Sequence, residues 1–288
     1  MELSIKSFVD YLQREKKYSP NTLSAYQGDL EQFRAFLQAE GSVKDVASVI
    51  ASDKEMLSRY LHSLRNKKYS VSTIARKIAS IKSLIKYMVD TGKIKDDVAP
   101  SISSPKVNKP APQPLTVSEV RMFLAEPDKK NSIESKRDKA MLELLYATGL
   151  RASELMGLNT DDMNFETGTV TCRKDRTKLR DVPMDAYIAK IVRDYMQDCR
   201  IKLVNSQNEP ALFVNTRGER LTRQGFWQII QGYADRINLE KKITPRSLRH
   251  SFAIHRLHGG ADLHTMQELL GHAHISTTRV YQDVRTRS

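Results

Sequence analysis

The sequence predicts a mainly α-helical protein of two domains, the second of which also holds a small antiparallel β-sheet. Apolar residues recur at steps of three and four along much of the chain, which is typical of amphipathic helices. Two stretches of strand character, 168–172 and 179–184, flank a charged turn and indicate a hairpin. Residues 99–115 contain five prolines in seventeen positions, and because proline cannot continue a helix they predict an extended connector. We therefore expect one domain at 1–108 and a second at 109–288.

Four helices are expected in the first domain. The opening segment carries apolar residues at positions 5, 8 and 12, and Ser19 is placed to cap a second helix with Pro20 in its first turn. Apolar residues then recur at helical spacing until Gly41. A third helix is expected around 56–64, and a fourth, with an apolar stripe over 74–88, ends near Gly92. The first domain should therefore be a small helical unit.

The second domain should combine helices with the small sheet. Thr116 and Glu119 form a capping-box pattern, and an apolar helix over 140–146 stops at Gly149. Residues 211–215, with a turn at 217–218, suggest another strand. Helices are expected to resume at three further places: after Asp185, after Thr222, and from Arg246 to the end.

Composition restricts the classes of function. The 288 residues include 47 Lys and Arg against 34 Asp and Glu, a formal net charge of +13, and the pI is near 9.6. The chain has no apolar run of about 18 residues and no secretory signal. Two isolated cysteines, Cys172 and Cys199, supply neither a disulfide framework nor a four-thiolate zinc site. We therefore expect a cytoplasmic protein with a polyanionic partner, most commonly nucleic acid, although ribosome association and plain solubility also produce basic chains.

Positive charge is concentrated between residues 65 and 95, where nine basic residues accompany one acidic residue, Asp90. Lys82 and Lys86 lie four residues apart and away from the apolar stripe, so they share a solvent face of the predicted fourth helix. Together with Arg76 and Lys77 they are candidate contacts to DNA phosphates. A plain solvated face is the alternative, and the near absence of acidic residues favours DNA. Both halves are cationic, with 19 basic against 12 acidic residues in 1–110, so one partner could touch both.

Three separated segments carry more polar residues than packing requires. They are ATGLRASEL at 147–155, TPRSLRHSFAIH at 244–255 and LLGHAHISTTRVY at 269–281. Together with SPNTLSAY at 19–26, they resemble the tyrosine recombinase (phage integrase) family, in particular its Xer-like branch. The motifs fall in the family's order, and His272 stands nine residues before Tyr281 as it does there. The resemblance implies a tyrosine recombinase fold, with a SAM-like core-binding domain at 1–108 and an α-rich catalytic domain at 109–288 that close around duplex DNA.

The resemblance also implies a site-specific recombinase in which the Tyr281 hydroxyl attacks a DNA phosphodiester and forms a 3′-phosphotyrosyl link. A phenol with a pKa of about 10 is a weak nucleophile at neutral pH unless its oxyanion is stabilised. The transition state gathers negative charge on phosphate oxygens, and guanidinium suits them because its planar fork donates two hydrogen bonds and keeps its charge. Arg151 and Arg249 match the family's two phosphate-binding arginines. No cofactor is expected, because the phosphotyrosine conserves the energy of the broken bond.

In the family, a lysine on the hairpin protonates the departing 5′ oxygen. Counting back from Val182 and Pro183 puts Asp175 where that lysine is expected, so the turn should be shifted or lengthened by one residue. Lys174 is the candidate, and Arg176 and Lys178 are its competitors. A turn is where a one-residue slip is most easily absorbed.

Two further residues follow from the resemblance, and two more from their positions beside Arg151 and Arg249. His272 matches the second-box histidine, which would hydrogen-bond the scissile phosphate or manage the tyrosine proton. Arg246 stands where the family usually places a histidine; arginine can donate to phosphate but cannot act as a base, so proton uptake would fall to His272 or solvent. Glu154 is expected to orient Arg151 or a backbone group, and His250 to have a packing role.

A metal-dependent nuclease and a non-catalytic DNA-binding protein are the two alternative functions. Six of the seven histidines lie between 250 and 274, but they have no acidic partner pattern of a metal nuclease, so no metal site is expected. A DNA-binding protein that uses this fold without chemistry is the stronger rival, and Arg246 is the feature that favours it.

The resemblance implies assembly as a homo-tetramer on paired sites of double-stranded DNA, with a second recombinase in the tetramer as the alternative. Only seven residues follow Tyr281, whereas relatives usually carry a longer tail that docks on a neighbour, so a shortened tail and a monomer in free solution are expected. The DNA site and the cellular substrate, whether chromosome dimer, plasmid, phage or transposon, stay open.

Overall fold

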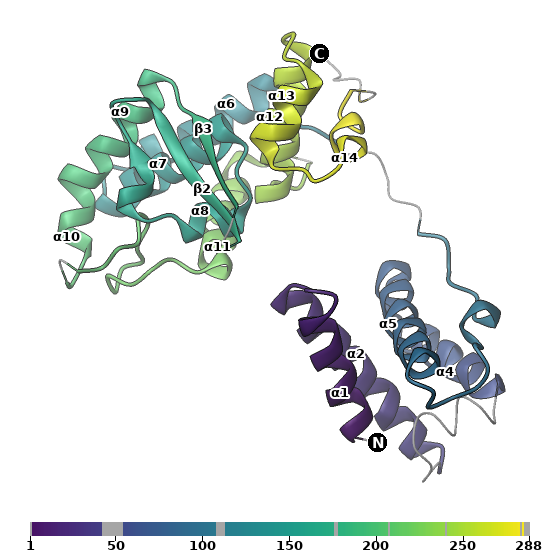
Figure 1. Cartoon of the computed structure of the whole chain (residues 1–288). Coiled ribbons are helices and arrows are strands. Elements are labelled where there is room, and N and C mark those ends of the chain that lie inside the picture. Colours follow the sequence, from purple (N-terminus) through teal and green to yellow (C-terminus); the bar gives the residue numbers. More distant parts are fainter. Residues whose placement is uncertain are drawn as a thin grey trace. The chain divides into compact units, whose positions relative to one another are not determined.

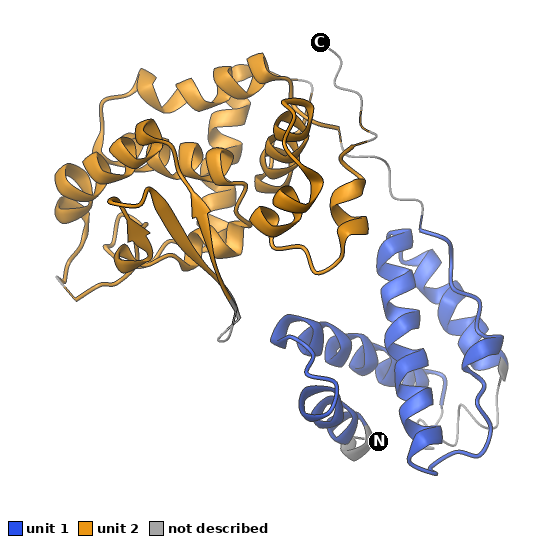
Figure 2. Cartoon of the chain, turned by 45° about the horizontal axis from the view of Figure 1, so that its top comes forward, with its two compact units in different colours: residues 1–109 blue, residues 110–288 orange. Residues whose placement is uncertain are grey.

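The computed structural model describes residues 2–41, 54–107, 113–175, 178–206, 208–239, 241–282 and 284 (Figure 1). The chain divides into two compact units, residues 1–109 and 110–288 (Figure 2). Within the described ranges, no helix has the length and apolar character that crossing a membrane requires.

Unit 1 contains the four predicted helices. They are α1 (Glu2–Arg14), α2 (Pro20–Ala39), α4 (Lys54–Asn66) and α5 (Val71–Asp90), followed by a 3-10 turn at Ala99–Ser101. Ser19 caps α2 by accepting the backbone N–H of Thr22 at 3.2 Å, as its place before Pro20 predicts. The apolar stripes of the four helices meet in one buried core. The helical spacing of apolar residues in the sequence therefore forms the core of this unit.

A buried carboxylate joins α2 to α5. Asp29 is 2% exposed; Lys77 Nζ donates to its Oδ1 at 2.9 Å, and Arg76 donates to its Oδ2. Lys77 is itself only 6% exposed, so it lies inside the unit and not on the face predicted for DNA. The reason is that the α5 face carrying the isoleucines also turns residue 77 inward, where Asp29 compensates its charge. Lys86 and Arg76 remain exposed, and Lys82 is half-buried.

Unit 2 is built from helices and one small sheet. Its helices are α6 (Val117–Ala125), α7 (Ile133–Thr148), α8 (Ala152–Gly157), α9 (Ala186–Asp194), α10 (Ile201–Leu203), α11 (Arg223–Ile237), α12 (Pro245–His258), α13 (Leu263–Leu270) and α14 (Ile275–Arg279). Short 3-10 turns at Glu126–Lys129 and Thr160–Asp162 and a π-helical turn at Tyr195–Arg200 connect them. The predicted capping box of Thr116 and Glu119 starts α6.

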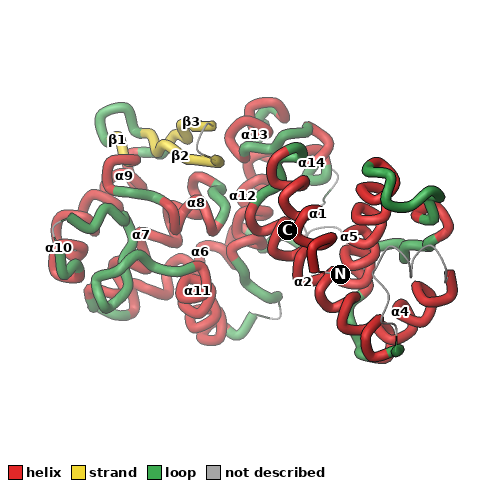
Figure 3. The backbone as a smooth tube through the Cα atoms, turned by 60° about the horizontal axis from the view of Figure 1, so that its bottom comes forward, coloured by secondary structure: helices red, strands yellow, loops and turns green. Residues whose placement is uncertain are grey.

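The sheet has three antiparallel strands in the order β1 (Met163–Asn164), β2 (Thr169–Asp175) and β3 (Lys178–Pro183). Figure 3 shows the strands gathered on one side of unit 2, beside α8 and α13. In the β2–β3 ladder, Arg173 pairs with Leu179 and Asp175 with Lys178, so Lys174 is an extra residue on β2. The predicted hairpin is present, and the two-residue strand β1 was not foreseen.

The strand predicted at 211–215 is wrong. These residues form two isolated bridges, Asn159 with Ala211 and Val214 with Arg220, and no ladder extends from either. Residues 211–214 are apolar and buried, as in a strand, but their backbone bonds are divided between Leu158 on one side and residues 219–221 on the other. The fold class is nevertheless confirmed as mainly helical with a small antiparallel sheet.

Gly149 ends α7 and directs the chain toward the site. Its φ is +62°, and a Cβ there would lie 2.3 Å from the ring of Phe252 on α12, so only glycine fits. The left-handed turn lets α7 end at Thr148 and α8 begin at Ala152, with Arg151 as the residue just before α8. This turn places the Gly149 carbonyl next to Arg249 of α12 and the Arg151 side chain next to the end of α13.

Candidate active site

Three arginines from distant parts of the sequence meet at the C-terminal end of α13. The last carbonyls of a helix carry partial negative charge and have no partner within the helix, so they attract cations. Each of three consecutive carbonyls accepts from a different guanidinium. The donor and acceptor pairs are Arg180 with Leu269 at 2.9 Å, Arg249 with Leu270 at 2.6 Å, and Arg151 with Gly271 at 3.1 Å.

Arg249 is the most deeply placed of the candidate residues in this group. It is 6% exposed and also donates from Nη1 to the Gly149 carbonyl at 2.6 Å. Burial, and then the positive charge of Arg151, lower the pKa of Arg249 to about 10. The guanidinium therefore stays charged at neutral pH, but burial has destabilised that charge, which favours an incoming anion.

Glu154 holds two of these arginines. Its carboxylate accepts from Arg151 Nη1 and from the Arg151 backbone N–H, each at 2.8 Å. Arg180 donates to both carboxylate oxygens, at 2.9 and 3.0 Å. Burial would raise the pKa of Glu154, but the hydrogen bonds from Arg180 and from the Arg151 backbone outweigh it and lower the pKa to about 2. Three guanidinium charges thus face one carboxylate, and the cluster keeps a net positive charge.

His272 is fixed through both ring nitrogens. Arg249 Nη2 lies 3.2 Å from His272 Nε2, and Thr278 Oγ1 lies 2.8 Å from His272 Nδ1. Because arginine can only donate, Nε2 accepts, so in the neutral imidazole Nδ1 carries the proton and donates it to Thr278. The nitrogen that faces Arg249 is therefore the basic one.

Tyr281 lies just after α14 and is packed among apolar side chains. It is 5% exposed and belongs to a buried cluster with Phe252, Met266 and Leu270. Its ring stacks on His272 with centroids 6.2 Å apart and meets the edge of His250 at 5.3 Å. Burial raises the pKa of the Tyr281 phenol above its usual value, and the charges of Arg249, Arg246 and Arg151 oppose that rise.

Arg246 and His250 form a second layer beside Tyr281. Arg246 is exposed, and its Nε donates to His250 Nε2 at 3.3 Å, one helical turn along α12. Burial, then Arg246 and Arg249, lower the pKa of His250 to about 4. His250 thus packs as a neutral imidazole against the ring of Tyr281, in line with the packing role expected for it.

Lys174 has its backbone in β2, at the extra residue of the β2–β3 ladder. Its side chain and that of Lys178 lie outside the described part of the chain, as does Arg176. The choice among these hairpin cations therefore stays a prediction.

Arg180 is the residue that sequence reasoning missed. The hairpin cations weighed from the sequence are Lys174, Arg176 and Lys178. The signal was the alternation of β3: Val182 and the ladder partner Cys172 are both buried, and position 180 shares their face. Leu179 in consequence is 60% exposed, whereas the charged side chain of Arg180 points inward.

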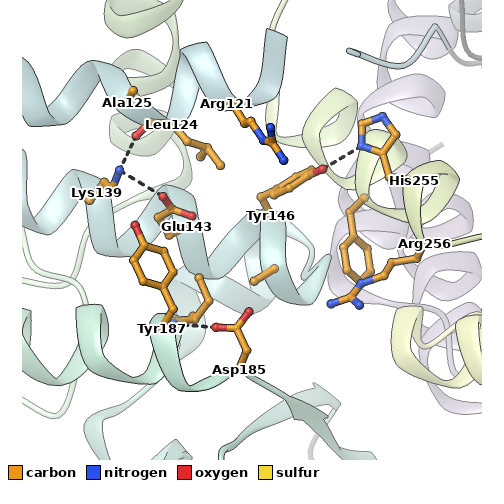
Figure 4. Close-up of a pocket in the computed structure, with 13 residues that line it drawn as sticks. Arg121, Leu124, Ala125, Lys139, Glu143, Tyr146, Asp185, Tyr187, His255 and Arg256 are labelled. Atoms are coloured by element: carbon orange, nitrogen blue, oxygen red, sulfur yellow. Dashed lines mark hydrogen bonds and ion pairs between the residues drawn. The ribbon is translucent and has the colours of Figure 1, made fainter. Parts of the chain in front are cut away.

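A cavity of about 580 Å³ lies elsewhere in unit 2, among α6, α7, α9 and α12 (Figure 4). Its walls include Tyr146, whose hydroxyl is 2.8 Å from His255 Nδ1, and the ion pair of Lys139 with Glu143. None of the five candidate catalytic residues whose side chains the structure describes lines it. The described residues also contain no group of three or more His, Cys, Asp and Glu side chains that could hold a metal ion. The convergent arginines, and not this cavity, are the candidate site.

Comparison with known proteins decides the family. The pattern described as "Phage integrase family" matches residues 113–287, and "Phage integrase, N-terminal SAM-like domain" matches residues 5–92. The chain belongs to the phage integrase family. Within it, the chain is 40% identical over 292 residues to the tyrosine recombinase XerC of Roseiflexus sp. (strain RS-1), covering all of this chain and 91% of the relative.

A second relative lies as near in sequence. The tyrosine recombinase XerD of Oceanobacillus iheyensis (strain DSM 14371) is 40% identical over 285 residues, covering 99% of this chain and 94% of the relative. In structure, the XerH site-specific recombinase in a complex with its difH substrate has a TM-score of 0.73 at 24% identity, covering 91% of this chain and 77% of that one. The last comparison shows the fold alone. The resemblance to Xer-like tyrosine recombinases is confirmed, and this tyrosine recombinase is an enzyme of site-specific DNA recombination.

Proposed function

We propose that this tyrosine recombinase cuts DNA with Tyr281 and exchanges strands between two sites through a 3′-phosphotyrosyl intermediate. One observation carries the proposal: Arg151 and Arg249 donate to adjacent carbonyls at the end of α13, Arg249 also donates to His272, and the Tyr281 ring stacks on that histidine. Packing has no need of such a concentration of positive charge, whereas a phosphate in its transition state does.

In the proposed reaction, the Tyr281 oxygen bonds to the phosphorus as the bond from phosphorus to the 5′ oxygen breaks. The phenolic proton passes to an acceptor, and the 5′ oxygen takes a proton from a donor. Attack by the 5′-hydroxyl of the second duplex reverses both events and rejoins the strand. Bond energy is conserved in the phosphotyrosine, so the reaction needs no nucleotide cofactor.

Arg151 and Arg249 would bind the non-bridging oxygens of the scissile phosphate. Their carbonyl acceptors at the end of α13 support this assignment, because they orient both forks before DNA arrives and so reduce reorganisation during the reaction. Arg246, exposed at the start of α12, can add a further hydrogen bond to phosphate but cannot take up a proton.

His272 would accept the phenolic proton. Nε2 carries no proton in this tautomer, and its lone pair becomes available to the phenol when Arg249 turns from Nε2 to the phosphate, while Thr278 holds the other nitrogen. Hydrogen bonds at catalytic groups often tighten only when substrate is bound. Lys174 on the hairpin would protonate the 5′ oxygen.

The DNA partner would contact both units. In unit 1, Lys86, Arg76 and the half-buried Lys82 on α5 are the proposed phosphate contacts, and Lys77 is left out because its side chain is buried against Asp29. The two units would act as the core-binding and catalytic domains of a clamp on duplex DNA. The recombinase would assemble as a homo-tetramer on paired sites, as the family resemblance implies.

The proposal is tested with a nicked suicide duplex, on which cleavage releases a short strand and traps any covalent adduct. The wild-type chain should give an SDS-resistant adduct, and Tyr281→Phe should give none. Tyr146→Phe is the matched control, because Tyr146 is a half-buried tyrosine packed against the same apolar cluster as Tyr281. An adduct that persists in Tyr281→Phe, or a wild-type chain that binds the duplex without any adduct, would contradict the proposal.

A further inference from the structure

Arg180 links three parts of the candidate site. Its Nε donates to the Leu269 carbonyl at 2.9 Å, and its two terminal nitrogens donate to the two oxygens of Glu154 at 2.9 and 3.0 Å. Glu154 in turn holds Arg151, and Leu269 lies three residues before His272. The Arg180 guanidinium therefore bonds to the carboxylate that orients Arg151 and to the end of the helix that precedes His272.

The loop after α13 is shaped around this guanidinium. A Cβ at Gly271 would lie 2.9 Å from Arg180 Nη1 and 3.1 Å from its Cζ, and the φ of Gly271 is +62°. The backbone conformation favours glycine here, and a larger residue would displace the guanidinium of Arg180. Arg151 donates to the carbonyl of the same glycine, so Arg180 and Arg151 hold the loop from two sides.

We infer that Arg180 is a positioning residue, which holds Glu154 and the end of α13 so that Arg151 and His272 are aligned before DNA binds. The inference rests on the proposed roles of Arg151 and His272. Arg180 is not one of the two arginines that match the family's phosphate-binding pair, and its nitrogens donate to Glu154 and Leu269, so we assign it a role through these groups.

Removal of Arg180 should also change how Glu154 titrates. The charged or titratable groups that face Glu154 are Arg151 at the start of α8, Arg180 on β3, Arg249 on α12 and the buried Cys172 thiol on β2. Hydrogen bonding from Arg180 is the largest influence that lowers the pKa of this carboxyl. Without it, burial should raise the pKa, so Glu154 would take up a proton at a higher pH and release Arg151.

The test measures the rate of adduct formation on the suicide duplex between roughly pH 5 and 9. Arg180→Met should slow the wild-type rate about 10²-fold, the loss expected from a small misplacement of catalytic groups, and the loss should grow toward the acidic end. Glu154→Gln should be slow without that pH dependence. If Arg180 acts through Glu154, the double variant should be little slower than Glu154→Gln.

Arg220→Met is the matched control, because Arg220 also donates to two carbonyls and a side-chain oxygen in unit 2 but touches no candidate residue. Arg180→Lys keeps a positive charge without the fork, so it should be slow while the wild-type pH profile is retained, and it decides the matter if Arg180→Met does not fold. Rates and pH profiles of both Arg180 variants equal to those of Arg220→Met would overturn the inference. Absence of any adduct from the wild-type chain would instead overturn the proposed function.

Discussion

Nη2 of Arg249 donates to Nε2 of His272 over 3.2 Å, joining side chains from α12 and from the loop after α13. The bond fixes the histidine tautomer, because arginine has no acceptor to offer. Nδ1 must then donate to Thr278 Oγ1, 2.8 Å away and fully buried. The basic nitrogen of His272 is thus set by a threonine six residues along the chain, three residues before Tyr281.

Thr278→Val should weaken both folding and cleavage. Valine keeps the shape of threonine but leaves the Nδ1 proton of His272 without an acceptor, at a cost of about 1–3 kcal/mol in the free energy of unfolding. Adduct formation should slow, because the ring is no longer held in one tautomer. Urea unfolding and the suicide-duplex rate measure the two effects. Thr277→Val, at an exposed neighbour on α14, should change neither; equal behaviour of the two variants would contradict the tautomer assignment.

His250 should make the protein less stable in acid. Its pKa is about 4 in the folded chain against 6.5 for the free side chain. Below about pH 6.5 the unfolded chain therefore binds a proton that the folded chain does not, and stability falls as pH drops from 6.5 toward 4. His250→Gln should flatten this part of a plot of unfolding free energy against pH, whereas His264→Gln, at an exposed site, should not. An unchanged slope in His250→Gln would mean that the imidazole is not held neutral.

Replacing Lys86 of α5 should weaken DNA binding, whereas replacing Lys77 of the same helix should lower stability. Lys86→Ala, measured in a Tyr281→Phe background that cannot cleave, should reduce the slope of log affinity against log salt by about 0.9, the effect of one lost phosphate contact. Lys77→Met should instead destabilise unit 1 by roughly 1–3 kcal/mol, because Asp29 loses a buried partner. Equal salt slopes in Lys86→Ala and its parent would remove Lys86 from the DNA face.

The proton donor on the hairpin can be found by changing the leaving group. Replacing the scissile 5′ oxygen with sulfur gives a thiolate, whose conjugate acid has a pKa of about 8.5 and which departs without a proton. Lys174→Ala should cleave the oxygen substrate slowly and the sulfur substrate at the wild-type rate. Lys178→Ala and Arg176→Ala are the controls, and sulfur rescue in one of these instead would move the role to that residue.

Much of this architecture could be predicted from the sequence, because the longer helices repeat an apolar spacing and several begin at a recognisable cap. Ser19 and Thr116 cap the helices that follow them, and Gly149 ends α7, as their residue types indicate. The motif residues Arg151, Arg249 and His272 are brought together by the fold as their shared motif membership suggests.

The remaining features depend on partners that spacing along one segment does not reveal. Lys77 is buried because Asp29, on another helix, compensates its charge. Arg180 points inward because it donates hydrogen bonds to Glu154 and to the end of α13, which its place among several hairpin cations does not reveal. Residues 211–214 are as apolar as a strand but find no continuous partner. In each case, the outcome depends on a contacting residue that is distant in the sequence.

The most direct test of the central claim is to locate the covalent bond to DNA. The trapped adduct is digested with nuclease and protease, and mass spectrometry identifies the peptide that retains a nucleotide. The account predicts one remnant, on Tyr281, joined through a 3′ phosphate and accompanied by a free 5′-hydroxyl on the released strand. A remnant on any other residue, or a 5′-linked one, would contradict it.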